Sequence, residues 1–588
     1  MERSELGSSS AKVPIVIGVT GHRDVQESAT GDLKRSIQRF LSKLAVKYPH
    51  SDFILLSALA EGADRLAARA ALELPRVRLV TPLPMHKPDY EQEFKTAESL
   101  AEFTELLARA ENWFELPVSE EKFDQDDSDS DSRRRPYGEL GWYIARHSHL
   151  LLALWDGDDA NGTSGTAKVV SLKLHGLPRP DELRCSLKEP AGIGPVHHIV
   201  SPRKERPAPA STAYSVQVLR PNRHDNGQDS LALYDSILAE IDDYNHEVQG
   251  QADAATERLR KSRIYLTGGI ELARASELLR AITERYAHAD VLATQYKQAQ
   301  QRTIFWLAAL ASLGFACLEV YDQLLVGYQW GPAVLLGFPL ALALALLSIR
   351  RSTLYHDKFL GYRALAEGMR VQYFWLALGA KWRVPDQYLD KHRGELQWVR
   401  WAIMAWVMPI GTPGSLEEAG LPLPLAERIT YLREQWVRDQ EKYFHRRIGV
   451  NSGLCDRSTR WRNGMFYIAV TVAVIVLLSQ VYMFAAGSGD ELRTLIEESL
   501  VLVVALAFVI GGAIAHYEEK MTYSEELLQY SLAHRRFNLA CELIGKAVEA
   551  GRQDIAQQLI HELGQEALWE NADWVQLHQH RPPSVPQA

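Results

Sequence analysis

The chain has 588 residues, of which 46% are hydrophobic and 24% are charged, and its formal net charge is −9. This length is enough for roughly three or four domains. The acidic balance argues against a nucleic-acid-binding protein, and the mean hydropathy of −0.20 excludes a transporter embedded in the membrane along most of its length. The four cysteines are far apart and form no Cys/His cluster, so we expect isolated thiols and no metal site.

The N-terminal part of the chain alternates between strand and helix patterns. Residues 1–12 are polar, and we expect them to be disordered and not a signal peptide. Within residues 13–202, the expected strands are VPIVIGVT, DFILLSA, RVRLVTPLP, HLLLALWDG and VHHIVSP, and the expected helices are Asp32–Lys47, Gly62–Leu74, Asp89–Ala110 and Thr166–His175. Continuous apolar strands separated by helices predict a parallel sheet covered on both faces, which is a doubly wound, Rossmann-like α/β fold. The acidic, serine-rich stretch 119–135 predicts a mobile, solvated loop inside this domain.

The rest of the chain reads as helical, with four apolar runs. These runs are Thr303–Leu318, Gly331–Ile349, Met465–Ala486 and Ser499–Ala515. Since a membrane span needs about 20 apolar residues, we predict an all-α membrane region with four transmembrane helices in two hairpins. The predicted segments are a linker at 203–228, cytoplasmic helices at 229–301, a first hairpin at 302–350, a cytoplasmic helical segment at 351–463, a second hairpin at 464–516 and C-terminal cytoplasmic helices at 517–588. Within the central segment, Trp398–Gly411 is too short to span and predicts an interfacial or buried helix.

The charges that flank the apolar runs predict the topology. Arginines precede the first run and follow the second, whereas the loop VYDQLLVGYQW inside the first hairpin contains no lysine or arginine. The positive-inside rule then places both termini in the cytoplasm of a multi-pass protein of the inner membrane. The two hairpins also resemble a duplication, because Tyr-x-x-Lys follows each of them, at Tyr355 and at Tyr517.

Candidate binding residues follow three of the predicted strands. Because ligands of open α/β sheets bind at the carboxyl ends of the strands, these turns are expected to form one pocket. A small-residue turn at a helix start binds phosphate through backbone N–H groups, and an arginine pairs with it bidentately. The candidates are Thr20, Gly21, His22 and Arg23 after the first strand, Ser57, Ala58, Glu61, Gly62 and Arg65 after the second, and Asp156, Gly162, Thr163, Ser164, Gly165, Thr166 and Lys168 after the fourth. The alternatives are that these are ordinary tight turns and that His22 has a structural role instead of an acid–base role.

The stretches GVTGHRDV, SALAEGADRLAA and WDGDDANGTSGTAKVV resemble the SLOG superfamily, which groups the DprA-type and LOG (lysine-decarboxylase-like) nucleotide-binding folds. The stretch YAHADVLATQYKQAQQR before a two-helix hairpin and the tail LGQEALWENADWVQLHQHRP resemble the SLATT membrane effectors of nucleotide-signalled defence. Together these two resemblances cover most of the chain.

The resemblance implies either an enzyme or a sensor. LOG enzymes carry a catalytic glutamate after the glycine-rich turn, but here Ala167 and Lys168 follow that turn. We therefore expect a sensor with no catalytic residue and no cofactor, which binds a nucleotide such as ADP-ribose or a cyclic nucleotide. Glu61 and Asp64 keep open an enzyme that hydrolyses nucleotides.

The expected function is that of a ligand-gated membrane effector. A nucleotide second messenger, made by a separate enzyme, would bind the SLOG-like domain of a homo-oligomer and trigger pore opening or membrane disruption in antiviral abortive infection. The alternatives are a membrane-anchored, phosphoribohydrolase-like enzyme and an ion channel whose SLOG-like domain is structural.

Overall fold

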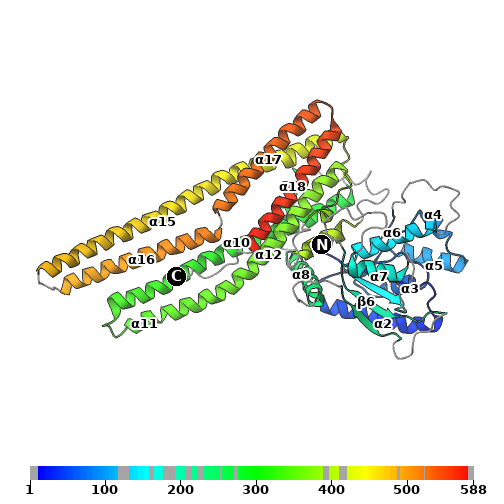
Figure 1. Ribbon diagram of the computed structural model, residues 1–588, viewed down its shortest axis with the longest axis horizontal. Coiled ribbons are helices and arrows are strands. Elements are labelled where there is room, and N and C mark those ends of the chain that lie inside the picture. Colours follow the sequence, from blue (N-terminus) through cyan, green and yellow to red (C-terminus); the bar gives the residue numbers. More distant parts are fainter. Residues whose placement is uncertain are drawn as a thin grey trace. The chain divides into compact units, whose positions relative to one another are not determined.

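The computed structural model describes residues 11–116, 131–157, 165–176, 192–204, 213–221, 230–251, 255–270, 276–388, 396–408, 420–486, 491–521 and 523–579. The chain forms two compact units (Figure 1). The first unit consists of Met1–His288, Leu365–Leu423 and Ala567–Ala572, and the second of Ala289–Ala364, Pro424–Glu566 and Asp573–Ala588. The helices α10 (Glu277–Val320), α12 (Gly337–Leu378) and α18 (Gln553–Gln579) contribute residues to both units.

A sheet forms the centre of the first unit. Its seven described strands lie in the order β4-β3-β2-β1-β5-β6-β7, and every neighbouring pair is parallel except β6 and β7. The strands are β1 (Ile15–Gly21), β2 (Phe53–Leu56), β3 (Val77–Leu83), β4 (Asn112–Glu115), β5 (Leu150–Trp155), β6 (Val196–Val200) and β7 (Val216–Leu219). Strands β2 and β5 are buried at every residue, as expected for central strands with helices on both faces. The predicted Rossmann-like α/β fold is confirmed.

Helices cover both faces of this sheet. On one face lie α2 (Thr30–Lys47) and α3 (Ala63–Ala71), and on the other lie α6 (Asp131–His147) and α7 (Thr166–His175) (Figure 1). A Cβ atom at Gly18 would lie 2.9 Å from the Ile144 side chain of α6, whereas one at Gly21 would lie 2.3 Å from Ala63 of α3. Glycine at these two positions of β1 therefore lets a helix approach the strand closely on each side.

Several local features of the sheet domain differ from the predictions. The predicted helix 89–110 is two helices, α4 (Lys87–Glu91) and α5 (Ala97–Ala108), because the Thr96 side chain accepts a hydrogen bond from the Ser99 N–H and starts a new helix. Helix α6 begins at Asp131, inside the stretch 119–135 that was predicted to be a loop, although residues 117–130 lie outside the described residues. Strand β4 was not predicted. Strand β7 is an extended piece inside the predicted linker 203–228, and it adds one edge strand to the sheet.

The chain start and the later helices complete the first unit. Ala11 is buried and the Lys12 carbonyl accepts a hydrogen bond from the Trp406 indole at 2.9 Å, which contradicts the predicted disorder for these two residues. Helix α13 (Gln397–Trp406) is a buried core helix, so the interfacial alternative for this segment is wrong. The indole of Trp401 stacks on His149 at 4.9 Å, directly before β5. The remaining helices of this unit are α8 (Ser230–Gly250), α9 (Thr256–Thr267) and the short 3-10 helices η1 (Glu27–Ala29) and η4 (Val384–Asp386).

Helix α8 is tied to the sheet by one buried amide. The Asn245 side chain accepts from the Val13 N–H at 2.8 Å and donates to the Val13 carbonyl and the Ser51 hydroxyl, each at 2.9 Å. The Ser51 hydroxyl donates in turn to Asp242 of the same helix at 2.7 Å. These bonds satisfy the backbone groups that precede β1, and they make α8 part of the sheet domain.

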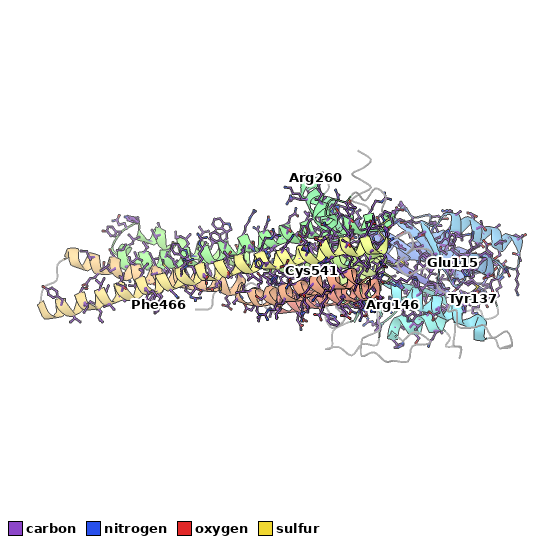
Figure 2. All side chains as sticks on the ribbon, turned by 90° about the horizontal axis from the view of Figure 1, so that it is seen from above. Glu115, Tyr137, Arg146, Arg260, Phe466 and Cys541 are labelled. Carbon is purple, nitrogen blue, oxygen red and sulfur yellow. The ribbon has the colours of Figure 1, made fainter. Side chains whose placement is uncertain are left out.

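The second unit is helical. Besides its parts of α10, α12 and α18, it contains the π-helical turns η3 (Tyr321–Leu325) and η5 (Arg433–Arg438) and the helices α11 (Gly331–Leu335), α14 (Leu425–Leu432), α15 (Asp439–Ala486), α16 (Glu491–Met521) and α17 (Tyr523–Glu549). Four of its helical stretches are long and apolar enough to cross a membrane, and at most 22% of each apolar window is buried. Large apolar side chains such as Leu347, Phe466 and Leu478 are more than half exposed along them (Figure 2). The chain therefore has the character of a membrane protein.

Each predicted hairpin is a pair of packed helices. In the first, a Cβ atom at Gly314 of α10 would touch Phe338 of α12 at 3.4 Å. In the second, the Ser479 hydroxyl of α15 donates to Glu497 of α16 at 2.7 Å. Behind the first hairpin α12 continues to Leu378; behind the second, α16 is described to Met521 and α17 from Tyr523.

Candidate functional site

The carboxyl ends of β1 and β5 form the point where the strand order reverses. From β1 the chain builds outward through β2, β3 and β4, and it then returns to β5 on the other side of β1. Loops that leave such a pair of strands diverge, and the crevice between them is the usual ligand site of an open α/β sheet. The predicted residues from Thr20 to Arg23 and Asp156 lie at this edge, and Gly165 opens the helix α7 that follows β5.

Two glycines lock the turns after β1 and β2 against each other. A Cβ atom at Gly21 would lie 2.3 Å from the Ala63 Cβ and 2.7 Å from the Leu154 carbonyl oxygen. Gly62 has a φ of +80°, and its Cβ would lie 2.3 Å from the Arg23 carbonyl oxygen. The Ala63 N–H donates to the His22 carbonyl at 3.0 Å. These glycines are therefore explained by close packing of one turn on the other.

A chain of charged groups crosses the edge from β1 to β6. The His22 Nε2 atom lies 3.1 Å from the Asp156 Oδ1 atom, and the Asp156 Oδ2 atom lies 3.6 Å from the Arg203 Nη1 atom. The Arg203 Nε–H group donates to both carboxylate oxygens of Asp24, at 3.1 and 3.0 Å. We call these four residues the edge network. Asp24 and Arg203 were not predicted, although Asp24 directly follows the predicted Arg23 and Arg203 lies three residues after the end of β6.

A buried carboxyl group lies beneath the turn after β2. Asp64 is 7% exposed and its side chain receives hydrogen bonds from the Ser57 hydroxyl and from the backbone of Ala58 and Ala60. Burial raises the pKa of Asp64 to about 7, against the opposing effects of these bonds and of the Arg23 charge. Ser57 and Ala58 are themselves buried, so they support the edge and do not line an open surface.

Glu61 and Arg65, which were predicted to bind a ligand, hold α5 in place. The buried Arg65 guanidinium donates to the Leu59 carbonyl at 3.0 Å, to the Ser99 carbonyl at 2.8 Å and to Glu102 at 3.0 Å. The Ser99 hydroxyl donates to the Glu61 carboxylate. Contacts within the chain therefore account for both charged side chains.

Arg23 and the start of α7 present groups that suit an anion. Arg23 is exposed and its guanidinium lies 5.1 Å from the ring centroid of Tyr137, a residue of α6 that Figure 2 shows on the sheet domain. Gly165 precedes α7 with a φ of +130°, and a Cβ atom there would meet nothing within 4 Å. Thr166 is buried and Lys168 is partly exposed on the first turn. Free N–H groups at a helix start and nearby cations attract a phosphate.

Some predicted residues lie outside this description. Gly162, Thr163 and Ser164 are outside the described residues. Across the described ranges, no group of three or more histidine, cysteine, aspartate or glutamate side chains is placed to hold a metal ion.

Comparison with known proteins adds no assignment. No protein-family model matches the chain, and no curated protein matches its sequence.

Proposed function

We propose that this chain is a membrane effector whose activity is triggered by a nucleotide bound at the β1–β5 edge. The observation that carries the proposal is that the exposed Arg23 follows β1, and that a helix start with the partly exposed Lys168 follows β5, the two strands at which the strand order reverses. Cations and backbone N–H groups would hold the phosphates, and the carboxylates of Asp24 and Asp156 would accept hydrogen bonds from ribose hydroxyl groups. The same chain carries four helical stretches that are long enough to span a membrane.

The resemblance to SLOG and SLATT proteins supports the same proposal. It favours ADP-ribose, another NAD-derived nucleotide or a cyclic nucleotide as the ligand, made by a separate signal-producing enzyme. The proposed protein is a homo-oligomer of the inner membrane with both termini in the cytoplasm, and it acts in antiviral abortive infection by opening a pore or disrupting the bilayer.

The helices that contribute to both units offer a covalent route from ligand to membrane. Helices α10 and α12 begin or end in the sheet-bearing unit and carry apolar stretches in the other unit. A ligand that binds the open state about a hundredfold more tightly than the closed state shifts the equilibrium between them by about 2.7 kcal/mol. A shift of this size changes the open fraction of a two-state channel strongly, so a soluble nucleotide suffices as the trigger.

Dye release from vesicles tests this proposal with the full chain. Phosphatidylcholine–phosphatidylglycerol vesicles containing the protein are loaded with a fluorescent dye, and ADP-ribose, its cyclic isomers and cyclic dinucleotides are added in turn. We expect release with one ligand class, and loss of that release in Arg23→Ala and Gly165→Glu. Losing one charge-assisted contact to phosphate should raise the required ligand concentration roughly 10- to 100-fold.

The control is Arg39→Ala, which removes an exposed arginine from α2 and should release dye as the unaltered protein does. Absence of release with every nucleotide would overturn the effector proposal. Equal release in all variants without ligand would instead favour a channel with a structural sheet domain.

The pairing of His22 with Asp156 favours an enzyme as the second candidate function. An imidazole 3.1 Å from a carboxylate is the arrangement in which a histidine acts as a general base oriented by an acid. If the protein hydrolyses a nucleotide, chromatography of the reaction mixture should detect released base or ribose, and His22→Gln should abolish that release. Unchanged nucleotide after long incubation at high protein concentration would exclude this function for the ligands tested.

A further inference from the structure

A cavity of about 490 Å³ lies inside the second unit, separate from the β1–β5 edge. Six helices line it: α10, α12, α15, α16, α17 and α18. Its lining residues lie near the ends of the apolar stretches: Ile304 lies at the start of the first stretch, and Tyr517 lies just after the fourth. No function proposed above uses this cavity.

The cavity wall has an excess of positive charge. Lys297 from α10, Arg447 from α15 and Lys520 from α16 line it, and Glu526 is the acidic residue among the lining side chains. The Asn451 amide donates to this carboxylate at 2.9 Å. The Arg447 Nε–H group also donates to the Tyr443 hydroxyl at 3.2 Å. The lining side chains thus carry three cations and one carboxylate, an excess that favours an anion in a partly enclosed space, where screening by solvent is weak.

The histidines of the cavity do not reverse this balance. The buried His356 ring makes one hydrogen bond through Nδ1 with the Gln300 amide at 2.6 Å and another through Nε2 with the His578 carbonyl at 2.9 Å. A carbonyl accepts, so Nε2 carries the proton and Nδ1 accepts from Gln300. Burial lowers the pKa of His356, which favours the neutral ring. Burial also lowers the pKa of Lys297, whereas the Glu526 carboxylate raises it, and a bound phosphate would raise it further.

Apolar groups form another part of the wall, beside polar side chains such as Gln298 and Gln301. Phe359 and Trp574 pack edge-to-face at 5.6 Å, and Ile304 and Leu454 line the side nearer the apolar stretches. The Lys297 Nζ atom lies 5.8 Å from the ring centroid of Phe359. A cavity lined by both cations and apolar side chains matches a ligand with a charged phosphate and a less polar body. This combination is expected where a helix bundle meets an anionic lipid surface.

We infer that this cavity is a binding site for a phosphate group, held by Lys297, Arg447 and Lys520. The phosphate belongs to the headgroup of an anionic phospholipid or to a small soluble phosphate ester. Occupancy neutralises three like charges that α10, α15 and α16 bring together, so the ligand stabilises the packing of these helices.

The experiment compares the two sources of phosphate on the full chain in neutral detergent. In one arm, native mass spectrometry measures how much added phosphatidylglycerol, compared with phosphatidylcholine, stays bound. In the other arm, thermal unfolding is followed with and without inorganic pyrophosphate. The variants are the double change Lys297→Gln with Lys520→Gln, and Leu454→Trp, which fills the cavity without changing its charge.

The control is Lys442→Gln, which removes an exposed lysine from α15 that does not line the cavity. We expect each lost lysine to weaken retention of the ligand roughly tenfold, and the control to retain it fully. Loss confined to phosphatidylglycerol retention identifies a lipid site, and loss confined to the pyrophosphate shift identifies a soluble ligand. Equal binding by all variants, or no preference for either phosphate compound, overturns the inference. Gel filtration and circular dichroism of each variant separate loss of binding from loss of folding.

Discussion

Replacing Asp64 by asparagine should change how the stability of the sheet domain depends on pH. The Asp64 carboxyl is buried beneath the turn after β2, and burial raises its pKa from 3.8 to about 7. The folded protein therefore keeps this proton over a pH range in which the unfolded chain has already released it. It follows that the contribution of Asp64 to the free energy of unfolding falls as the pH rises from about 4 to about 7.

The size of the change in unfolding free energy follows from the pKa difference between the folded and the unfolded chain. Each unit of pKa difference corresponds to about 1.4 kcal/mol, so a shift of about three units changes the free energy of unfolding by about 4 kcal/mol between the two ends of this range. Asparagine has the same shape and no proton to release in this range. The substitution removes the pH-dependent contribution of this residue to the free energy of unfolding. It leaves a difference that is constant with pH, which comes from the altered hydrogen bonds with Ser57 and the neighbouring backbone.

The assay is urea unfolding of the full chain in neutral detergent, followed by tryptophan fluorescence at several pH values from 4 to 8. The quantity of interest is the difference in unfolding free energy between the unaltered protein and Asp64→Asn at each pH. Asp89→Asn serves as the control for the loss of one carboxylate, because Asp89 is exposed at the start of α4. A flat difference for Asp64→Asn, within about 0.5 kcal/mol, would refute the claim that burial dominates this carboxyl group.

Three further changes test the packing and the membrane assignment. Gly21→Ala places a methyl group 2.3 Å from the Cβ of Ala63 and should destabilise the protein by about 1–3 kcal/mol in the same urea assay, whereas Gly31→Ala, in an open position of α2, should not. Asn245→Ala removes three buried hydrogen bonds, so we expect a loss of about 2–4 kcal/mol and faster hydrogen exchange in α8; an unchanged midpoint would contradict this role. Leu478→Lys puts a charge on an exposed apolar face of α15 and should cost about 2.5–3.5 kcal/mol of membrane insertion, seen as a larger carbonate-extractable fraction after membrane fractionation.

The sequence predicts the central strands well and the edge strands poorly. β1, β2 and β5 are buried on both faces, so their sequences are continuous apolar runs that stand out from their surroundings. The two missed strands lie at the sheet edges and have exposed residues: β4 reads NWFE and β7 reads VQVL. A short edge strand needs apolar side chains on one face only, and its remaining pairing depends on a neighbour that the local sequence does not reveal.

The candidate site is predicted at the level of the turns but not at the level of single side chains. The turns after β1 and β5 meet because parallel strands end at one edge, which the strand pattern alone implies. Arg23 and Arg65 look alike in the sequence, since each follows a strand and opens toward a helix. The two arginines differ in their contacts, because the Arg65 guanidinium donates to Ser99 and Glu102 on α5, which lie more than thirty residues further along the chain. Local sequence cannot distinguish an arginine that stays exposed from one that ties two helices together.

The charge of Arg23 influences the ionisation of Asp64, and a phosphate bound to Arg23 would change that influence. Arg23 favours the ionised form of Asp64 and so opposes the effect of burial on its pKa. A phosphate paired with Arg23 would cancel part of that positive field and raise the pKa of Asp64 further, which adds a proton near neutral pH. In the proposed sensor, the exposed arginine therefore links an anion at the surface to a carboxyl group beneath it. The same link explains why a buried acid is tolerated in the first turn of α3: Arg23 and the Ser57 hydroxyl stabilise its charged form, and burial, which destabilises the charged form, favours the neutral one.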